Sequence, residues 1–229
     1  MLRFNLTFFG GRGAGSGGGL PMSYPGGGGG NSKNKGPMDQ APGEMATAAE
    51  ALGPQGRAMN ITAAVSGANP YHDLGAEYQE NCQRCVIATE ARLRGYDVQA
   101  LPTYDGDTMP YQNNYLSNFD LPNRSVVNTI RRTTARANQN EVESQMASYG
   151  DGARAFMAFN WKGGNSGHVI NVVQSRGRTR YYDGQNGTEV SASHLFNAIS
   201  TASQRGIQLT RVDNLQFSDT VNRSLRPHS

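Results

Sequence analysis

The sequence has few cysteines, little net charge and no long apolar run, and each shortage excludes a class of protein. Only two cysteines occur among 229 residues, so no disulfide framework holds the chain together. No stretch approaches the roughly 18 apolar residues that a membrane span needs. The formal net charge of +3 is too small to indicate nucleic-acid binding by itself. We therefore expect a globular protein with neither a nucleic-acid nor a membrane partner.

The N-terminal part of the chain has a composition of its own. Gly occupies 13 positions within residues 10–36, out of 29 in the whole chain. Such a segment cannot bury apolar surface, so we expect residues 1–38 to be disordered. The first nine residues lack the continuous apolar run of a secretory signal, and we expect no signal peptide. Gly13, Gly15 and Gly18 match the spacing of a dinucleotide-binding loop, but they follow no strand and open no helix.

The rest of the chain is expected to contain one domain with short flanking segments. Residues 39–68 show an Ala-rich helical pattern broken at Gly53 and Pro54, which predicts a tether or a loosely docked helix. The domain is predicted over residues 69–215, followed by a polar tail over 216–229. Within the domain, predicted helices come first and a cluster of strands follows. This order indicates an α+β fold with a mostly antiparallel sheet.

Composition and periodicity also place the individual elements. Helices are predicted over 76–94, 125–135, 140–149 and 191–202, and strands over 98–101, 153–161, 167–174, 179–182 and 207–212. The third and fourth strands are β-branched or aromatic runs separated by Ser-Arg-Gly-Arg, a pattern typical of an antiparallel hairpin.

The two cysteines, Cys82 and Cys85, carry the most informative motif. Asn81 is a residue type that often caps a helix, which makes Cys82 the first helical residue. There the helix dipole and unpaired N–H groups favour a thiolate and could hold an oxyanion. Two inert buried thiols, half of a zinc site and a thiol-exchange motif are the alternatives. The sequence offers no second Cys pair and no closely spaced His pair to complete a zinc site.

A candidate base and its orienting partner lie on the predicted hairpin. His168 opens its first strand and Asp183 ends its second. With an even-numbered loop, the two side chains project from the same face, whereas a three-residue loop would separate them. A Cys at a helix N-terminus, followed along the chain by such a His and Asp, indicates a cysteine hydrolase.

Three segments then resemble a known family. NCQRCVIATEARLRGYDVQALP, GHVINVV and YYDGQNG are similar to the papain-fold toxin domain of the glutamine deamidase type, which occurs in bacterial polymorphic toxins and in phage or prophage proteins. The resemblance covers about residues 69–215. It implies a papain-like cysteine hydrolase fold and a triad of Cys82 as nucleophile, His168 as base and Asp183 as orienter.

The resemblance leaves the oxyanion donor open. Papain-like proteases keep a Gln shortly before the Cys for this role, and this chain has Ala76 at that position. Gln79 and Asn81 are the candidate substitutes, and Gln185 is similar to a Gln often found beside the Asp. Cys82 is preferred over the second thiol as nucleophile because it directly follows the expected cap.

The resemblance also implies a protein substrate, with deamidation of a Gln side chain favoured. A peptidase of the same fold is one alternative, and a non-enzymatic accessory protein of a phage particle is another. The Gly-rich opening resembles tails of phage head-associated proteins, which implies phage particle proteins as partners. The expected locations are the cytoplasm, a phage particle or a target cell into which the protein is delivered. No cofactor and no metal are expected.

Overall fold

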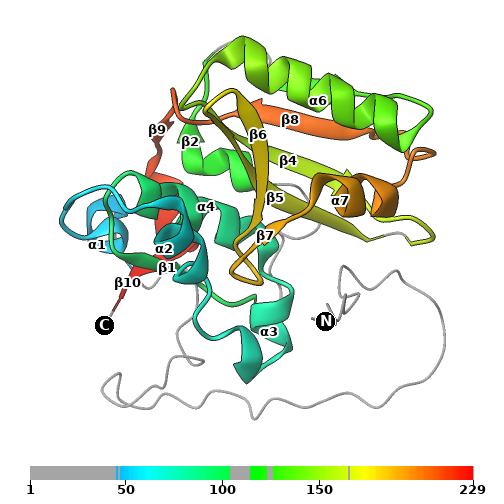
Figure 1. The fold of residues 1–229 in the computed structure, drawn as a ribbon. Helices are drawn as coiled ribbons and strands as arrows, with labels where there is room; N and C mark the ends of the chain where they lie inside the picture. Colours follow the sequence, from blue (N-terminus) through cyan, green and yellow to red (C-terminus); the bar gives the residue numbers. More distant parts are fainter. Residues whose placement is uncertain (1–44, 46, 104–113, 123–125, 165, 229) are drawn as a thin grey trace, which may run out of the picture.

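The computed structural model describes residues 45, 47–103, 114–122, 126–164 and 166–228. The predicted disordered segment 1–38 lies outside these residues. Six antiparallel strands form the main sheet in the order β3-β8-β4-β5-β6-β7 (Figure 1). These strands are β3 (Val127–Ile130), β4 (Arg154–Asn160), β5 (Gly167–Ser175), β6 (Arg178–Asp183), β7 (Thr188–Val190) and β8 (Ile207–Arg211). With the helices below, they make the α+β fold that the sequence predicts.

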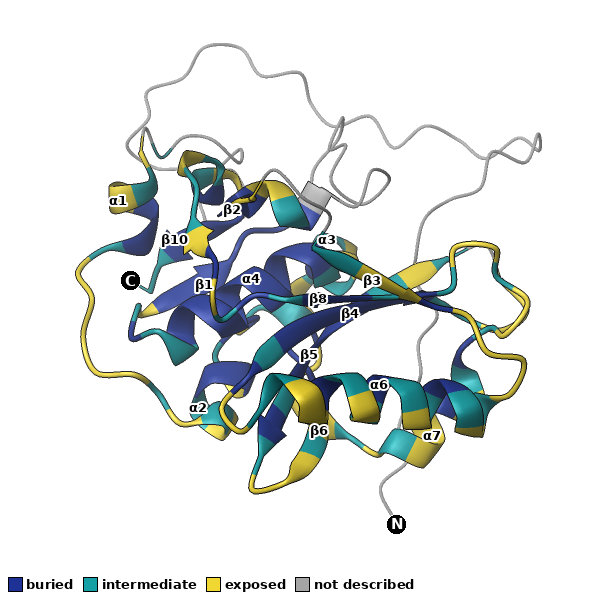
Figure 2. Ribbon diagram, turned by 90° about the horizontal axis from the view of Figure 1, so that it is seen from above, coloured by how far each residue is buried: buried dark blue, intermediate teal, exposed yellow. Residues whose placement is uncertain are grey.

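Helices cover both faces of the main sheet (Figure 2). One face packs against α6 (Ala135–Tyr149) and α7 (Ala192–Ala198), in a core that contains Met157 and Ile170. The other face packs against α4 (Cys82–Leu93), in a core that contains Phe156 and Val169. The alternation of side chains along each strand produces this division, because successive residues point to opposite faces. Consequently α4 is the helix that meets the sheet at the predicted catalytic strands.

Smaller elements surround α4. The described residues before it form the helical segments α1 (Ala48–Leu52), α2 (Ile61–Ser66), η1 (His72–Leu74) and α3 (Ala76–Gln79). β1 (Val98–Ala100) pairs with β10 (Leu225–Pro227), and β2 (Phe119–Asp120) pairs with β9 (Gln216–Phe217). Two short 3-10 helices, η2 (Asn114–Asn118) and η3 (Asp219–Arg223), complete this side of the molecule. No helix among the described residues has the length and apolar character needed to cross a membrane.

Both segments that flank the predicted domain differ from expectation. In α1 and α2, Leu52 and Val65 are buried, so residues 47–68 are part of the folded body and not a loose tether. Residues 216–228 are likewise not a polar tail, because Val221 and Leu225 are fully buried. The C-terminal segment carries little apolar periodicity, so its local pattern did not predict a strand. β10 is stabilised by its pairing with β1, which is far away in the sequence.

One predicted helix is a strand. The segment predicted as a helix over 125–135 contains β3, whose Ile130 pairs with Ile207 of β8. Val127, Thr129 and Ile130 are β-branched residues that suit a pleated surface, and the neighbouring strand decides their conformation. The following helix, α6, begins at Ala135, where the predicted segment ends. The hydroxyl of Thr134 caps it by accepting from the N–H of Ala137 at 3.2 Å.

Candidate active site

The predicted long helix over 76–94 is divided just before the cysteines. α3 ends at Gln79, and α4 begins at Cys82, after Asn81 at the N-cap position. The backbone carbonyl of Asn81 accepts from the N–H groups of Arg84 and Cys85 at 2.9 and 3.1 Å. The division places Cys82 in the first turn, with its side chain partly exposed.

The side chain of Asn81 does not cap the helix. It is buried, and its amide Nδ2 donates to the Oδ1 of Asn69 at 3.2 Å and to the carbonyl of Leu101 at 3.1 Å. Its Oδ1 accepts from the Cys85 thiol at 3.1 Å. The N-cap position was therefore predicted correctly, but the amide is engaged elsewhere and is not available as an oxyanion donor.

Asn69 links the start of α4 to the segment that follows β6. Its Nδ2 donates to the carbonyl of Tyr78 at 2.8 Å and to that of Gln185 at 3.0 Å. Because Asn69 also accepts from Asn81, one buried amide connects both parts of the site. A buried and satisfied polar network of this kind fixes its members in one arrangement. Sequence reasoning did not identify Asn69, since a lone Asn in a polar stretch carries no distinctive signal.

The hairpin predicted from the sequence is confirmed. β5 and β6 pair from Asn171–Tyr182 to Ser175–Arg178, so Arg176 and Gly177 form a two-residue turn. Both turn residues have positive φ, 52° and 70°, as the twisted turn of a tight hairpin requires. The even loop puts His168 and Asp183 on the same face, diagonal to each other.

His168 and Asp183 form a shielded ion pair. The Nε2 of His168 lies 3.0 Å from the Oδ2 of Asp183, and each side chain is 10% exposed. Two further donors hold the carboxylate. The backbone N–H of Gln185 donates to Oδ1 at 3.0 Å, and the Nδ2 of Asn186 donates to Oδ2 at 2.7 Å. The carboxylate is thus oriented toward the imidazole by the turn that follows β6.

Cys82 interacts with His168 as well. Burial by itself lowers the pKa of His168, but the Asp183 carboxylate raises it, and the Cys82 side chain adds to the rise through a hydrogen bond and its charge. The net result is a pKa of about 10 for His168. Since Nε2 faces Asp183, Nδ1 is the ring nitrogen left for the thiol. The imidazole is therefore protonated at neutral pH.

The electrostatics separate the two thiols. Burial raises the pKa of Cys85 well above its usual value, and the nearby charges of Cys82 and Asp183 raise it further. Although burial opposes ionisation of Asp183, the charge of His168 and the hydrogen bonds to the carboxylate lower its pKa. Cys85 is thus a neutral, enclosed thiol, whereas Cys82 is partly exposed beside an imidazolium.

Two features around the pair were not found from the sequence. The ring of Trp161 lies nearly parallel to that of His168, with centroids 5.6 Å apart. Gly184 packs against α4, where an added Cβ would lie 2.5 Å from the Oγ1 of Thr89 and 3.0 Å from the carbonyl of Cys85. This glycine therefore allows the end of β6 to approach the helix closely. A single Trp at the end of a predicted strand was the available signal for Trp161.

The other oxyanion candidates lie in different environments. The Nε2 of Gln79 donates to the carbonyl of His72 at 3.3 Å, which leaves its second N–H. The Nε2 of Gln185 is buried and has no partner among the described residues. The backbone N–H of Cys82 donates no hydrogen bond to any of the described residues. The first N–H groups of any α-helix have no carbonyl partner within the helix, and this N–H is one of them.

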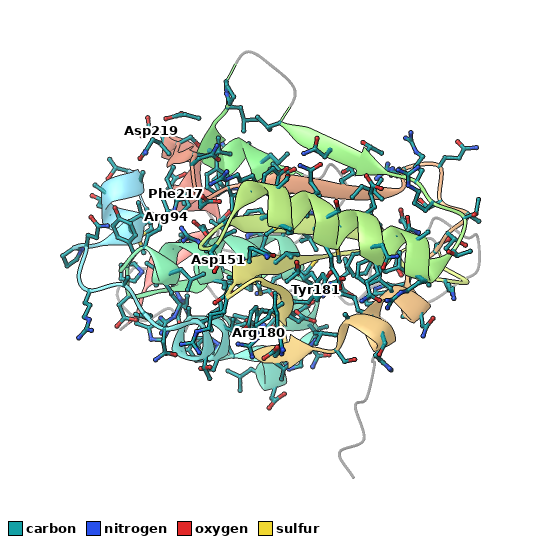
Figure 3. All side chains as sticks on the ribbon, turned by 45° about the horizontal axis from the view of Figure 1, so that its top comes forward. Arg94, Asp151, Arg180, Tyr181, Phe217 and Asp219 are labelled. Carbon is teal, nitrogen blue, oxygen red and sulfur yellow. The ribbon has the colours of Figure 1, made fainter. Side chains whose placement is uncertain are left out.

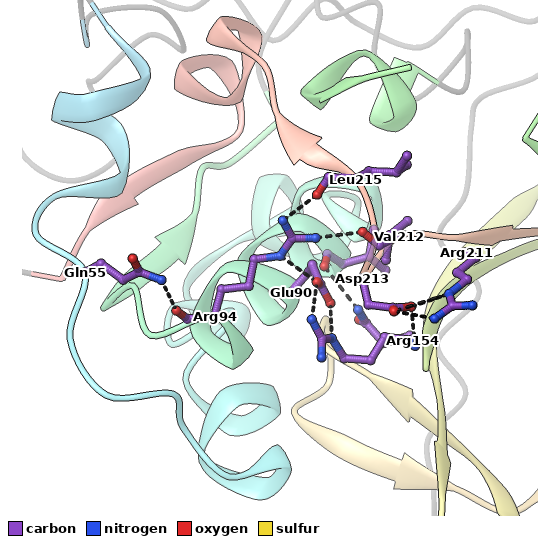
Figure 4. A network of polar contacts seen from close by, with 10 residues as sticks. Gln55, Glu90, Arg94, Arg154, Arg211, Val212, Asp213 and Leu215 are labelled. Carbon is purple, nitrogen blue, oxygen red and sulfur yellow. Dashed lines mark hydrogen bonds and ion pairs between the residues drawn. The ribbon is translucent and has the colours of Figure 1, made fainter. Parts of the chain in front are cut away.

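The far end of α4 is fixed by buried charges (Figure 4). Glu90, whose side chain is fully buried, accepts from Arg94 at 2.7 Å and from both Nε and Nη2 of Arg154 at 2.8 Å. Arg94 also donates to the carbonyls of Val212 and Leu215 at 2.7 Å. Its guanidinium lies 4.5 Å from the ring centroid of Phe217, beside which it appears in Figure 3. These contacts secure α4 to β4 and to the segment after β8.

Comparison with known families agrees with this geometry. Residues 80–188 match the model of the family described as papain fold toxin 1, glutamine deamidase. The match confirms the resemblance and the papain-like fold predicted from the sequence, and it contains Cys82, His168 and Asp183. No curated protein and no solved structure matched the chain. Within the described residues, no group of three His, Cys, Asp or Glu side chains is arranged to hold a metal ion.

Proposed function

Taking residues 80–188 as a papain-fold glutamine deamidase domain, we propose that the protein hydrolyses the side-chain amide of a glutamine in a protein substrate. Cys82 is the nucleophile, His168 the general acid and base, and Asp183 the orienting group. The observation that carries this assignment is the 3.0 Å contact between His168 and Asp183 beside a thiol in the first turn of α4. A base held by a third group is the arrangement that activates a nucleophile.

The first half of the reaction forms a thioester. The Cys82 thiolate attacks the Cδ of the glutamine side chain, and the carbonyl oxygen becomes an oxyanion. His168, protonated at neutral pH, gives its proton to the leaving nitrogen, so that ammonia departs and the thioester remains. Asp183 stabilises the imidazolium and keeps the ring aligned.

The second half hydrolyses the thioester. Neutral His168 removes a proton from water as the water oxygen attacks the acyl carbon. Collapse of this intermediate releases a glutamate side chain and restores the Cys82 thiolate beside the protonated imidazole. No cofactor takes part in either half.

The backbone N–H of Cys82 is our first choice for the oxyanion donor. It lies at the start of α4, where the helix dipole favours negative charge, and it has no partner among the described residues. Gln79 is the second donor that we propose, because one of its amide hydrogens remains available. Asn81 is excluded by its existing bonds.

The direct test is mass spectrometry of candidate target proteins incubated with wild-type protein or with Cys82→Ala. We expect a Gln-to-Glu conversion at specific sites with the wild type and none with the variant. Cys85→Ser serves as the matched control, since it alters a thiol on the same helix turn and should preserve the conversion. Chain cleavage in place of conversion would identify the peptidase alternative.

A second measurement separates an enzyme from a non-enzymatic accessory protein of a phage particle. An activated Cys82 should be alkylated by iodoacetamide at neutral pH much faster than an ordinary thiol. His168→Ala should slow that alkylation. Alkylation at the rate of a free cysteine, in both proteins, would favour the accessory protein. The toxin family match supports action on a protein in a target cell after delivery.

A further inference from the structure

Charge is distributed unevenly between the two ends of the main sheet. Ile130 at the end of β3 pairs with Ile207 at the start of β8, and Phe159 near the end of β4 pairs with His168 at the start of β5. Because β8 also pairs with β4, all four of these strand termini lie at the same end of the sheet. The candidate general base is therefore located at this end.

This end of the sheet is rich in exposed cations. Arg131 and Arg132 follow β3 directly, Arg136 lies in the first turn of α6, Lys162 follows β4, and Arg205 precedes β8. All five are exposed. We call these five residues the basic end. Within the described residues 131–141, 161–164 and 199–206, the single carboxylate is that of Glu141.

Local contacts hold the basic end together without neutralising it. The Nε of Arg131 donates to the carbonyl of Gln204 at 2.8 Å, which ties the segment after β3 to the loop before β8. Glu141 pairs with Arg132 at 2.8 Å, but both side chains are about half exposed, so water screens the pair. The N-terminus of the 15-residue helix α6 adds further partial positive charge at this place.

The opposite end of the sheet carries carboxylates among its cations. The β5–β6 turn carries Arg176 and Arg178, and the N–H of Gly177 donates to the carboxylate of Asp151. Arg180 forms an ion pair of 2.6 Å with Glu189. Asp151 and Arg180 can be followed in Figure 3. This end therefore has a mixed charge and serves as an internal reference.

From this asymmetry we infer that the basic end binds an acidic segment of the protein substrate, next to the glutamine that reaches Cys82. The inference rests on the proposed function, because it treats the bound protein as the substrate. A protein that approaches His168 along β5 lies over the start of that strand, where Lys162 and its neighbours are exposed. Complementary charge would speed encounter and exclude basic partners.

The test uses two fluorescent peptides that share a central glutamine, one flanked by Glu and one by Lys. Binding is measured by anisotropy on the Cys82→Ala protein, so that it does not depend on turnover. The variant Arg136→Glu/Arg205→Glu changes the basic end, and Arg176→Glu/Arg178→Glu makes the same change of charge at the opposite end.

We expect the acidic peptide to bind better than the basic one, and the basic-end variant to lose about tenfold in affinity at low salt. The control should lose less than about twofold, and high salt should remove the difference. Equal losses in both variants, preference for the Lys-flanked peptide, or tighter binding of a single-stranded oligonucleotide would overturn the inference. Acidic-peptide binding that the basic-end variant loses, without glutamine conversion by the wild type, would support the acidic-segment site and count against the deamidase assignment.

Discussion

The two ends of α4 serve opposite purposes. At its C-terminal end, Glu90 is fully buried and every described partner is a close donor. At its N-terminal end, Cys82 is partly exposed and its backbone N–H is unused among the described residues. The first end holds the helix in place, and the second leaves groups available for a substrate. Mutations at the N-terminal end of α4 should therefore change activity, whereas mutations at its C-terminal end should change stability.

The largest effect is expected from Cys82→Ala. Removing the nucleophile should lower kcat/KM by several orders of magnitude, on the order of 10⁶-fold for a group that cannot be replaced. A first-turn position tolerates Ala, so the unfolding midpoint should stay close to that of the wild type. Glutamine conversion measures the first quantity and thermal unfolding by circular dichroism the second. Retained conversion would move the nucleophile elsewhere.

For Glu90→Ala, the expected effect is on stability. Arg94 and Arg154 would lose their buried counter-charge, and the free energy of unfolding should fall by about 3–5 kcal/mol. Urea unfolding measures this loss. Glu189→Ala is the matched control, because its ion pair with Arg180 is about half exposed and should contribute no more than about 1 kcal/mol. Similar losses from both variants would show that burial does not determine how much an ion pair contributes to the free energy of unfolding.

A smaller effect is expected from Asp183→Ala. The imidazole can still accept a proton but is poorly oriented, so kcat/KM should fall on the order of 10²- to 10⁴-fold, less than for His168→Ala. Without the carboxylate the pKa of His168 should also fall, and the high-pH limb of the rate profile should move to lower pH. An unchanged profile would indicate that another group sets the charge of His168.

The same pair predicts how stability depends on pH. The pKa of His168 is about 10 in the folded chain and about 6.5 in the unfolded one, so its contribution is complete below about pH 6.5 and is lost as pH rises toward 10. The pKa of Asp183 is lowered by folding, so its contribution is lost at acid pH. The difference in unfolding free energy between wild type and Asp183→Asn should therefore shrink from neutral pH toward pH 10. Guanidinium unfolding across this range measures it.

The smallest effect is expected from Cys85→Ser. The hydroxyl can keep the bond to the Oδ1 of Asn81, and the volume change is small, so the cost in stability should be about 1 kcal/mol. Activity should stay within a few-fold of the wild type. Loss of activity with the fold intact would show that the inner thiol takes part in the chemistry.

Local patterns predicted the parts of the site that local contacts create. The hairpin of β5 and β6 follows from β-branched runs and a Gly-containing turn, and the start of α4 follows from Asn81. The bonds that join these parts could not be predicted, since Asn69 meets Gln185 across 116 residues of chain. Likewise β3 and β10 depend on strands far along the sequence. The hydrophobic pattern does not indicate that the helix packs against the hairpin. The resemblance to a family implied this contact.

The two-residue turn at Arg176 and Gly177 has a consequence for the order of folding. His168 and Asp183 are only 15 residues apart, so closing the loop between them costs little chain entropy. The helix that carries the thiol meets the same strand through Asn171 and Val86, which are 85 residues apart. Contacts of such high sequence separation form late in folding. A nascent or partly unfolded chain should therefore form the His168–Asp183 pair first and bring Cys82 to it last. Under the proposed function, such a chain would be inactive until α4 has docked.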